Sequence, residues 1–316
     1  MILFETIIIF ALLLGIGQIL RRTKFEDAIR RVLRIFIIYV ALPALVLATF
    51  LKNPVHLSNF ILTFIAFVIL VFGIFVAFFA SKFLNLDKPS AGSFIITSAH
   101  ANTGFLGYPI SFYFFGSTGL FYAVLYDLGM FIGLITIVTF TAGIYGKNKP
   151  NISNILLNFF KFPPLYAFIF GILIGNFWGV GVEGIMADTV NLFELIGSTS
   201  LFFTLLYLGM YLDIGKISKF IKISVLSSVI KLGAIPAFAF LIICLMGLLN
   251  IPLTPMEKNI ILLQSLMPSG LMTMILAVHY KLNSDIASGN VLVTTLIFFF
   301  LLFVLSLLFG HKIFFL

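Results

Sequence analysis

The chain has 316 residues, of which 61% are hydrophobic and 9% are charged, and its formal net charge is +8. Soluble domains carry about 25% charged residues, so this composition excludes a soluble domain and indicates an integral membrane protein in a lipid bilayer. The basic residues fall in short segments between apolar stretches, where they set membrane topology instead of binding nucleic acid. The single cysteine, Cys244, gives no basis for disulfides or a thiolate metal cluster, and we expect neither a metal nor a cofactor.

Ten stretches are apolar and long enough to cross a hydrocarbon core of about 30 Å, which needs roughly 20 helical residues. In chain order they cover residues 2–20, 33–51, 58–80, 91–115, 118–145, 163–180, 190–212, 223–249, 257–280 and 286–310. The amphipathic segment 24–34, which precedes the second stretch, is expected to lie along the membrane surface. The sequence therefore predicts an all-α polytopic membrane protein with ten transmembrane helices.

Lys and Arg divide unevenly between the two sides of the membrane when successive connections are assigned to alternate sides. One side holds Arg21, Arg22, Lys24, Arg30, Arg31, Arg34, Lys82, Lys88, Lys147, Lys149, Lys161, Lys216, Lys219, Lys222 and Lys281. The other side holds Lys52, Lys258 and Lys312, while Lys231 falls within a span. Because Lys and Arg concentrate on the cytoplasmic side, both termini are expected on the outer side of the plasma (inner) membrane.

Residues 1–150 and 151–316 each contain five of the predicted spans, and because five is odd the two halves run in opposite directions. This is the layout of two inverted five-helix repeats. Helix-breaking residues interrupt the fourth span of each half, which are the fourth and ninth spans of the chain. Such paired interruptions point to a transporter's substrate site, because freed backbone groups survive in a bilayer only inside protein or beside a wet cavity.

The two interruptions supply the candidate substrate-binding residues. In each, the second half-helix begins at mid-membrane, so its amino end and the positive end of its dipole point into the protein. Two such ends with free N–H groups form an anion site, whereas the carbonyl ends of the first half-helices suit a cation or water. The predicted residues are Asn102, Thr103, Gly104, Gly107 and Pro109 in the first interruption, and Gln264, Pro268, Ser269 and Gly270 in the second.

Three ionisable side chains within the predicted spans are candidates for proton or ion coupling: Asp127, Lys231 and His100. An ionisable group inside a bilayer is costly and therefore suggests a function. The alternatives are a structural ion pair, a lysine that extends to the interface and a histidine that packs between helices. Roughly 13 Å along the membrane normal separates Asp127 from Lys231, at about 1.5 Å per residue, so a direct pair requires tilted or kinked helices.

The segment Ala101-Asn-Thr-Gly-Phe-Leu-Gly-Tyr-Pro109 resembles the fourth-helix signature of the auxin efflux carrier family. This family includes plant PIN-type carriers and prokaryotic carriers of malonate or other organic anions. Leu266-Met-Pro-Ser-Gly270 is similar to its ninth-helix pattern, although alanine is more usual at the position of Gly270. The resemblance spans nearly the whole chain and implies the fold of bile-acid symporters and sodium/proton antiporters, with two broken helices that cross at Pro109 and Pro268.

The leading hypothesis is a secondary transporter that carries a small organic anion, such as a carboxylate, by alternating access around the crossed helices. Coupling to H⁺ or Na⁺, or uniport without either, stays open. A cation/proton exchanger or a sodium-coupled symporter of the same fold is the alternative within transport, and a channel or a receptor is the alternative from another class.

Two further expectations concern catalysis and assembly. No sequence motif of a nucleophile with its base, of a metal site or of ATP binding is present, so the chain is not expected to be an enzyme. A homodimer stays open, because the strongest small-residue pattern, Gly171-Ile-Leu-Ile-Gly175, is a weak signal.

Overall fold

The computed structural model describes residues 2–148, 160, 163–178, 185–211 and 220–309. Within these ranges the chain is helical, with one isolated β-bridge and no longer strand. Six helices are long and apolar enough to cross a membrane: Glu26–Lys52, Leu57–Phe83, Thr103–Tyr145, Ala187–Tyr211, Ile221–Leu248 and Ser284–Val304. Two shorter apolar helices, Ile8–Arg21 and Pro163–Asn176, accompany them. The protein is thus a multi-pass, all-helical membrane protein.

The elements follow one another in short succession. The first half of the chain forms α1 (Ile2–Arg21), α2 (Glu26–Phe36), η1 (Ile37–Ala41), α3 (Leu42–Lys52), η2 (Leu57–Phe60), α4 (Ile61–Phe83), α5 (Lys88–Ala99), η3 (Thr103–Gly107), α6 (Tyr108–Gly133), η4 (Leu134–Val138) and α7 (Thr139–Tyr145). The second half forms α9 (Pro163–Trp178), α10 (Ile185–Ser198), α11 (Ser200–Tyr211), α12 (Ile221–Val229), η6 (Ile230–Ala234), α13 (Ile235–Leu248), α14 (Pro255–Ser265), α15 (Leu271–His279) and α16 (Ser284–Phe309). Of the short segments, η2 is a 3₁₀-helix and η1, η3, η4 and η6 are π-helical.

Residues 26–34 of the segment predicted to lie along the membrane surface do not form a helix separate from the following span. Instead, α2 continues through η1 into α3 as one helix of 27 residues. Its side chains Leu33 and Ile37 are buried in the same core as those of α3, so the amphipathic pattern marks a helix with one buried face.

Gly116 separates the two spans predicted at 91–115 and 118–145. It lies inside α6 with φ 63° and ψ −157°, a backbone conformation that glycine adopts without steric cost. Two helical segments of α6 therefore meet at a kink at this residue.

Three of the π-helical segments each end two residues before a proline, at Pro43, Pro109 and Pro236. Proline lacks an N–H group and its ring clashes with the carbonyl group four residues earlier. A local π-helical turn relieves this clash and lets the helix continue through the membrane. These prolines therefore adjust continuous helices and do not end them.

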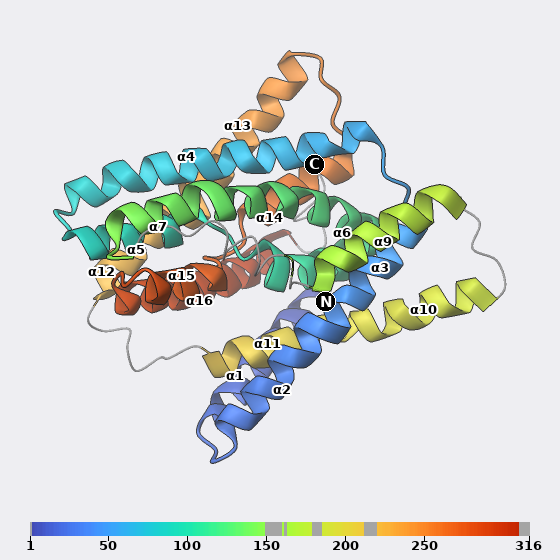
Figure 1. The fold of residues 1–316 in the computed structure, drawn as a ribbon, viewed down its shortest axis with the longest axis horizontal. Coiled ribbons are helices and arrows are strands. Elements are labelled where there is room, and N and C mark those ends of the chain that lie inside the picture. The colour runs from blue at the N-terminus through green and yellow to red at the C-terminus, as the bar shows by residue number, and fades with distance from the viewer. Residues whose placement is uncertain (1, 149–159, 161–162, 179–184, 212–219, 310–316) are drawn as a thin grey trace.

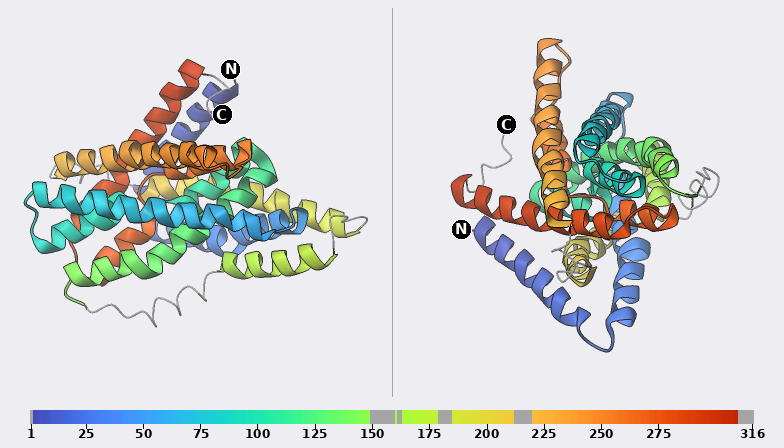
Figure 2. Two further views of the ribbon diagram at one scale, coloured as in Figure 1. Left: turned by 90° about the horizontal axis from the view of Figure 1, so that it is seen from above. Right: turned by 90° about the vertical axis from the view of Figure 1, so that its left-hand side faces the viewer.

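The helices form two groups, which we call the first and the second bundle (Figure 1). In the first bundle, α3 packs against α9 and α10, and α1 and α2 pack against α11. In the second bundle, α4 packs against α5 and α6, α12 packs against α16, and α5 packs against α7 and α16. The bundles meet where α3 and α11 contact α6 and where α1 contacts α16, and Figure 2 shows the α1–α2 hairpin extending away from the second bundle.

Aromatic rings fill much of the contact between the bundles. Phe10 of α1 packs edge-on against Tyr113 of α6 and Phe299 of α16, at centroid distances of 5.7 Å and 6.3 Å. Phe50 of α3 lies 5.2 Å from Phe121 of α6. These contacts are apolar and non-directional compared with hydrogen bonds.

Glycines bring the backbones of the first bundle into close contact. A Cβ atom on Gly17 of α1 would lie 2.4 Å from the carbonyl oxygen of Leu206 on α11. On α9, a Cβ atom on Gly171 or Gly175 would lie 2.6 Å or 2.3 Å from Phe50 of α3. The Gly171–Gly175 pattern, predicted as a weak dimer motif, is thus occupied by a helix of the same chain.

Hydrogen bonds link pairs of interhelical connections that are predicted to lie on the same side of the membrane. At one end of the second bundle, the N–H of Lys147 donates to the carbonyl of Tyr280 at 3.0 Å, and the N–H of Asn283 to that of Pro89 at 3.3 Å. At the other end, the Asn53 amide contacts the Ser117 hydroxyl at 3.1 Å. The first end carries lysine-rich connections of the predicted cytoplasmic side.

We expect Gly17→Ala to lower the thermal stability of the protein while Gly15→Ala does not. The new methyl group at residue 17 meets the backbone of α11, and overpacking of this kind costs about 1–3 kcal/mol. No atom lies within 4 Å of the same methyl group at Gly15 on the same helix, where alanine improves helix propensity. Melting temperatures of the two variants in one detergent test this, and equal values would contradict the close α1–α11 packing.

Candidate functional site

Two extended segments cross in the second bundle and pair through their backbones. Ala101 and Ser269 form an antiparallel bridge. The N–H of Asn102 donates to the carbonyl oxygen of Pro268 at 2.8 Å, and the N–H of Gly270 donates to that of His100 at 2.9 Å. Each broken helix thereby satisfies backbone groups that the other leaves free, as a lipid environment requires.

The resemblance implied a crossing at Pro109 and Pro268, and the structure agrees only for Pro268. The first helix is interrupted between Ala99 and Thr103, and Pro109 lies in the first turn of α6 after the π-helical η3. The second helix is interrupted between Ser265 and Leu271. The residue that faces Pro268 across the crossing is Asn102.

The close approach of the two segments at the crossing requires glycine at position 270. A Cβ atom there would lie 2.5 Å from Nδ1 of His100 and 2.9 Å from the carbonyl oxygen of Ala101. The alanine that the resemblance favours at this position does not fit while the His100 ring lies against it. Gly270 thus lets the second segment approach the first.

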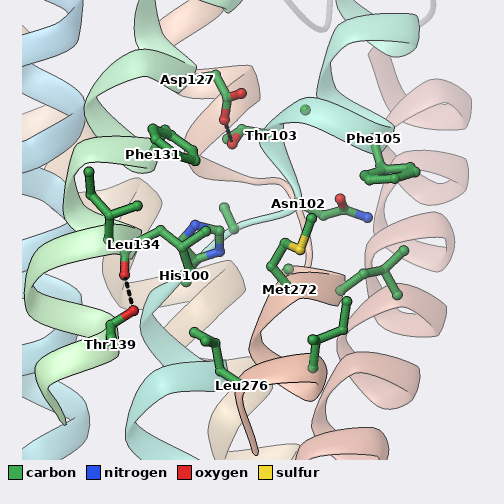
Figure 3. A pocket seen from close by; sticks show the side chains of 16 residues that line it. His100, Asn102, Thr103, Phe105, Asp127, Phe131, Leu134, Thr139, Met272 and Leu276 are labelled. Carbon is green, nitrogen blue, oxygen red and sulfur yellow. Dashed lines mark hydrogen bonds between the residues drawn. The ribbon is translucent and has the colours of Figure 1, made fainter. Parts of the chain in front are cut away.

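A cavity of about 350 Å³ lies beside the crossing (Figure 3). The starts of η3 and α15 form one end of it, so both amino ends of the second half-helices border the cavity. Apolar side chains form most of the remaining wall: Phe105, Phe131, Leu134, Ile135, Leu271, Met272, Ile275 and Leu276. Its polar side chains are His100, Asn102, Thr103, Asp127 and Thr139, and no Lys or Arg of the described ranges lines it.

The predicted site residues divide into two sets. Those that line the cavity are His100, Asn102, Thr103, Gly104, Asp127 and Gly270. Those outside its wall are Gly107, Pro109, Lys231, Gln264, Pro268 and Ser269. Of the second set, Pro268 and Ser269 lie in the crossing itself.

Asp127 lies on the neighbouring helix α6 and contacts the start of η3. Its carboxylate accepts a hydrogen bond from the hydroxyl group of Thr103 (Figure 3). It also accepts one from the hydroxyl group of Tyr108 at 2.7 Å. A Cβ atom on Gly104 would lie 3.3 Å from this carboxylate, so glycine leaves it room. Asp127 is partly exposed and faces the cavity. The arrangement places one carboxyl group beside the amino end of a half-helix.

Gln264 lies on the other side of the crossing from the cavity. Its amide nitrogen donates to the Ser111 hydroxyl at 3.1 Å, and both residues are fully buried. A Cβ atom on Gly107 would lie 2.2 Å from the Gln264 side-chain oxygen, so the glycine makes space for this amide. Gln264 and Gly107 therefore pack the second half of the fourth span against α14.

Lys231 contacts the carbonyl end of a half-helix and not Asp127. Its ammonium group lies 3.3 Å from the backbone oxygen of Ser265, the last residue of α14, and the side chain is 1% exposed. A cation at a helix carboxyl end is stabilised by the helix dipole. The described ion pairs join other residues, so the direct Asp127–Lys231 pair is absent from the described part of the chain.

Residues of α16 support the crossing, and the sequence prediction missed them. The hydroxyl of Thr294 accepts a hydrogen bond from the N–H of Ser269 at 3.1 Å, and the Asn290 amide donates to the Thr97 hydroxyl of α5 at 2.7 Å. All four residues are 0% exposed. The clustering of polar residues within the apolar tenth span was the one signal that could have indicated them.

The described residues do not suggest a metal site, because no three His, Cys, Asp or Glu side chains gather within those ranges.

Comparison with known proteins places the chain among membrane transport proteins. A family model described as membrane transport protein matches residues 3–306. An uncharacterized transporter of Methanocaldococcus jannaschii is 29% identical over 304 residues, which cover 93% of this chain and 95% of the relative. An uncharacterized transporter of Methanothermobacter thermautotrophicus is 26% identical over 307 residues, with coverage of 93% and 94%.

We expect Thr294→Val to destabilise the protein while Thr295→Val has little effect. The first change leaves the buried N–H of Ser269 without its acceptor, at a cost of about 1–3 kcal/mol. The second removes a hydroxyl that contacts only the carbonyl of Val291 within its own helix, at a similarly buried position. Thermal unfolding of both variants measures the difference. A larger loss for Thr295→Val would contradict the supporting role of Thr294.

Proposed function

Because the chain belongs to the membrane transport protein family, the family of the auxin efflux carriers, we propose that it is a secondary transporter for an organic anion with one carboxylate and an apolar body. The observation that carries this proposal is the composition of the cavity beside the crossing, where two helix amino ends meet mostly apolar walls.

The carboxylate of the substrate would lie at the crossing. The amino ends of η3 and α15 supply backbone N–H groups and positive dipole ends. Asn102 borders this end of the cavity, and its side-chain amide can donate to a carboxylate oxygen. The carbonyl end of α14 is neutralised by Lys231, which supports an anion over a cation at this place.

The apolar walls favour a single carboxylate. Away from the crossing the cavity is lined by Leu134, Ile135, Ile275 and Leu276, and its described wall contains no Lys or Arg. A second carboxylate there would lose its hydration without gaining a counter-charge, which is strongly unfavourable. A hydrocarbon or aromatic body would instead gain free energy from burial.

We further propose that Asp127 couples transport to a proton. An ionised Asp127 and a substrate carboxylate would repel each other across one small cavity. Protonation of Asp127 removes this repulsion, so anion and proton would bind together. The Lys231 ammonium lies at the carbonyl end of α14, where a sodium ion would otherwise be expected, and this supports protons over sodium. A cation/proton exchanger is the second candidate, since Asp127 could also bind a cation.

Alternating access would arise from movement of one bundle against the other. The ten predicted spans, divided at 1–150 and 151–316, would contribute their first two helices of each half to the first bundle and their last three to the second. The α1–α11 and α3–α9 pairs then correspond under the proposed inverted repeat, which supports it. With the positive-inside orientation, and both termini outside, the cavity lies on the cytoplasmic side of the crossing.

We expect proteoliposomes that contain the full chain to transport hexanoate at least about tenfold better than adipate, judged by kcat/KM. The two six-carbon acids differ in the second carboxylate, and tenfold corresponds to about 1.4 kcal/mol, less than the cost of one unpaired buried charge. Asn102→Ala should raise the KM for hexanoate by about tenfold, since a charge-assisted hydrogen bond is lost. Equal transport of both acids would contradict the proposed substrate class.

The matched control for Asn102→Ala is Asn191→Ala, whose side chain is exposed in the first bundle. It should leave the KM unchanged. Leakage through protein-free liposomes is subtracted throughout, because protonated hexanoate crosses lipid.

We expect Asp127→Asn to abolish the response of hexanoate uptake to an imposed pH gradient while exchange of labelled for unlabelled hexanoate continues. The side-chain oxygen of asparagine can accept the hydrogen bond from Thr103 or the one from Tyr108, but asparagine cannot bind or release a proton. Asp285→Asn, at an exposed position in the first turn of α16, is the control and should respond as the original chain does. A pH response that survives in Asp127→Asn would rule out this coupling role.

A further inference from the structure

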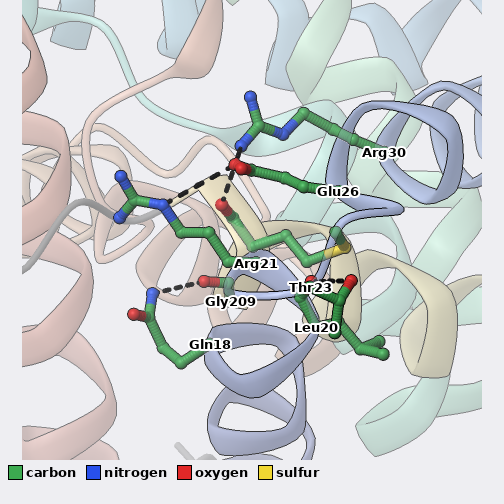
Figure 4. Close-up of polar contacts among 8 residues, drawn as sticks. Gln18, Leu20, Arg21, Thr23, Glu26, Arg30 and Gly209 are labelled. Atoms are coloured by element: carbon green, nitrogen blue, oxygen red, sulfur yellow. Dashed lines mark hydrogen bonds and ion pairs between the residues drawn. The ribbon is translucent and has the colours of Figure 1, made fainter.

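The turn between α1 and α2 carries an unusual density of basic side chains. Six Lys and Arg residues fall between positions 21 and 34. Two of them are engaged within the protein: Figure 4 shows Arg21 and Arg30 on either side of the Glu26 carboxylate. The other four are exposed and form no ion pair within the described part of the chain: Arg22, Lys24, Arg31 and Arg34.

An exposed apolar stripe continues from these bases along the same helix. Val32, Ile35 and Tyr39 are 65%, 48% and 58% exposed, and spacings of three and four residues place them on one face. Arg31 and Arg34 each neighbour this stripe in sequence. The opposite face of the helix carries the buried Leu33 and Ile37. The helix therefore presents bases at its amino end and apolar side chains farther along.

We propose that this face binds an anionic phospholipid. Its headgroup phosphate would lie at Arg31 and Arg34, and one acyl chain would follow Val32, Ile35 and Tyr39. Clusters of four to eight basic residues next to a membrane-spanning helix attract anionic lipid headgroups, because each base near the surface strengthens binding. Arginine also matches phosphate geometry with two parallel hydrogen bonds.

Two other basic residues at the same predicted membrane side, Lys82 and Lys88, do not offer this combination. Lys82 lies over the rings of Phe78 and Phe79, at 4.3 Å and 5.8 Å from their centroids. Lys88 stands at the first position of α5, which is followed by Pro89 and by buried residues from Ser90 onward. These two lysines belong to the second bundle and provide a control of equal charge.

The proposed lipid would bind the first bundle only. The Arg30 guanidinium lies 3.4 Å from the carbonyl oxygen of Met210, so α2 is joined to α11 beside the basic turn. The cavity at the crossing belongs to the second bundle. A bound lipid would hold the first bundle at the membrane surface without contacting the substrate.

The test compares lipid binding by the full chain and two double variants, with native mass spectrometry and the melting temperature as measurements. The probes are dioleoyl phosphatidylglycerol and dioleoyl phosphatidylcholine, added to detergent-solubilised protein. We expect Arg31→Gln with Arg34→Gln to weaken phosphatidylglycerol binding on the order of tenfold or more, and to abolish its stabilising effect, because two of the four exposed bases are lost.

Lys82→Gln with Lys88→Gln, which removes the same charge, should keep the affinity of the original chain for phosphatidylglycerol. Equal loss in both double variants would show a non-specific charge effect and overturn the site. Equal affinity of the original chain for both lipids would also overturn it. Lipid binding is measured without transport, so a negative result would overturn the lipid site and would not bear on the proposed substrate or coupling.

Discussion

The backbone pairing at the crossing is the constraint on which the remaining structure depends. In hydrocarbon an unpaired N–H or carbonyl group costs several kcal/mol, so a helix can be interrupted there only if partners for its free groups are supplied. The segments around Asn102 and Pro268 supply them to each other. Both helices must therefore break at the same depth, Gly270 must lack a side chain beside His100, and Thr294 must face Ser269.

The same pairing makes the two ends of the half-helices electrostatically different. At the carbonyl end of α14 the Lys231 ammonium offsets the negative end of the helix dipole. The amino ends of η3 and α15 border the cavity, and neither α14 nor Lys231 supplies a counter-charge to them. Among the described residues that line the cavity, Asp127 alone can bring negative charge to that end, and hydrogen bonds from Thr103 and Tyr108 satisfy its oxygens. The local field there depends on the charge state of one carboxyl group.

Sequence patterns predicted the membrane class, and some of the predicted site residues line the cavity beside the crossing while others do not. Asn102, Thr103 and Asp127 do line the cavity, because polar residues in an apolar span are rarely without partners. The prediction that the crossing lies at Pro109 was wrong, because a proline after a π-helical turn leaves the helix continuous, as Pro43 and Pro236 also do. Cavity walls such as Leu134 and Leu276 could not be predicted, because buried and lipid-facing side chains are equally apolar and hydropathy does not separate them.

The location of the hydrogen bonds limits how access to the cavity could change. The crossing, the Thr294 contact and the Asp127 contacts all lie within the second bundle, and separating the crossed segments would expose unpaired backbone groups at mid-membrane. Contacts between the bundles include the aromatic pairs Phe10–Tyr113 and Phe50–Phe121 and the Asn53–Ser117 hydrogen bond. The aromatic packing tolerates sliding without loss of directional bonds. Under the proposed alternating access, movement of the second bundle as one body therefore costs less free energy than separation of the crossed segments. The crossing would then stay intact while the bundle surfaces on either side of it open and close.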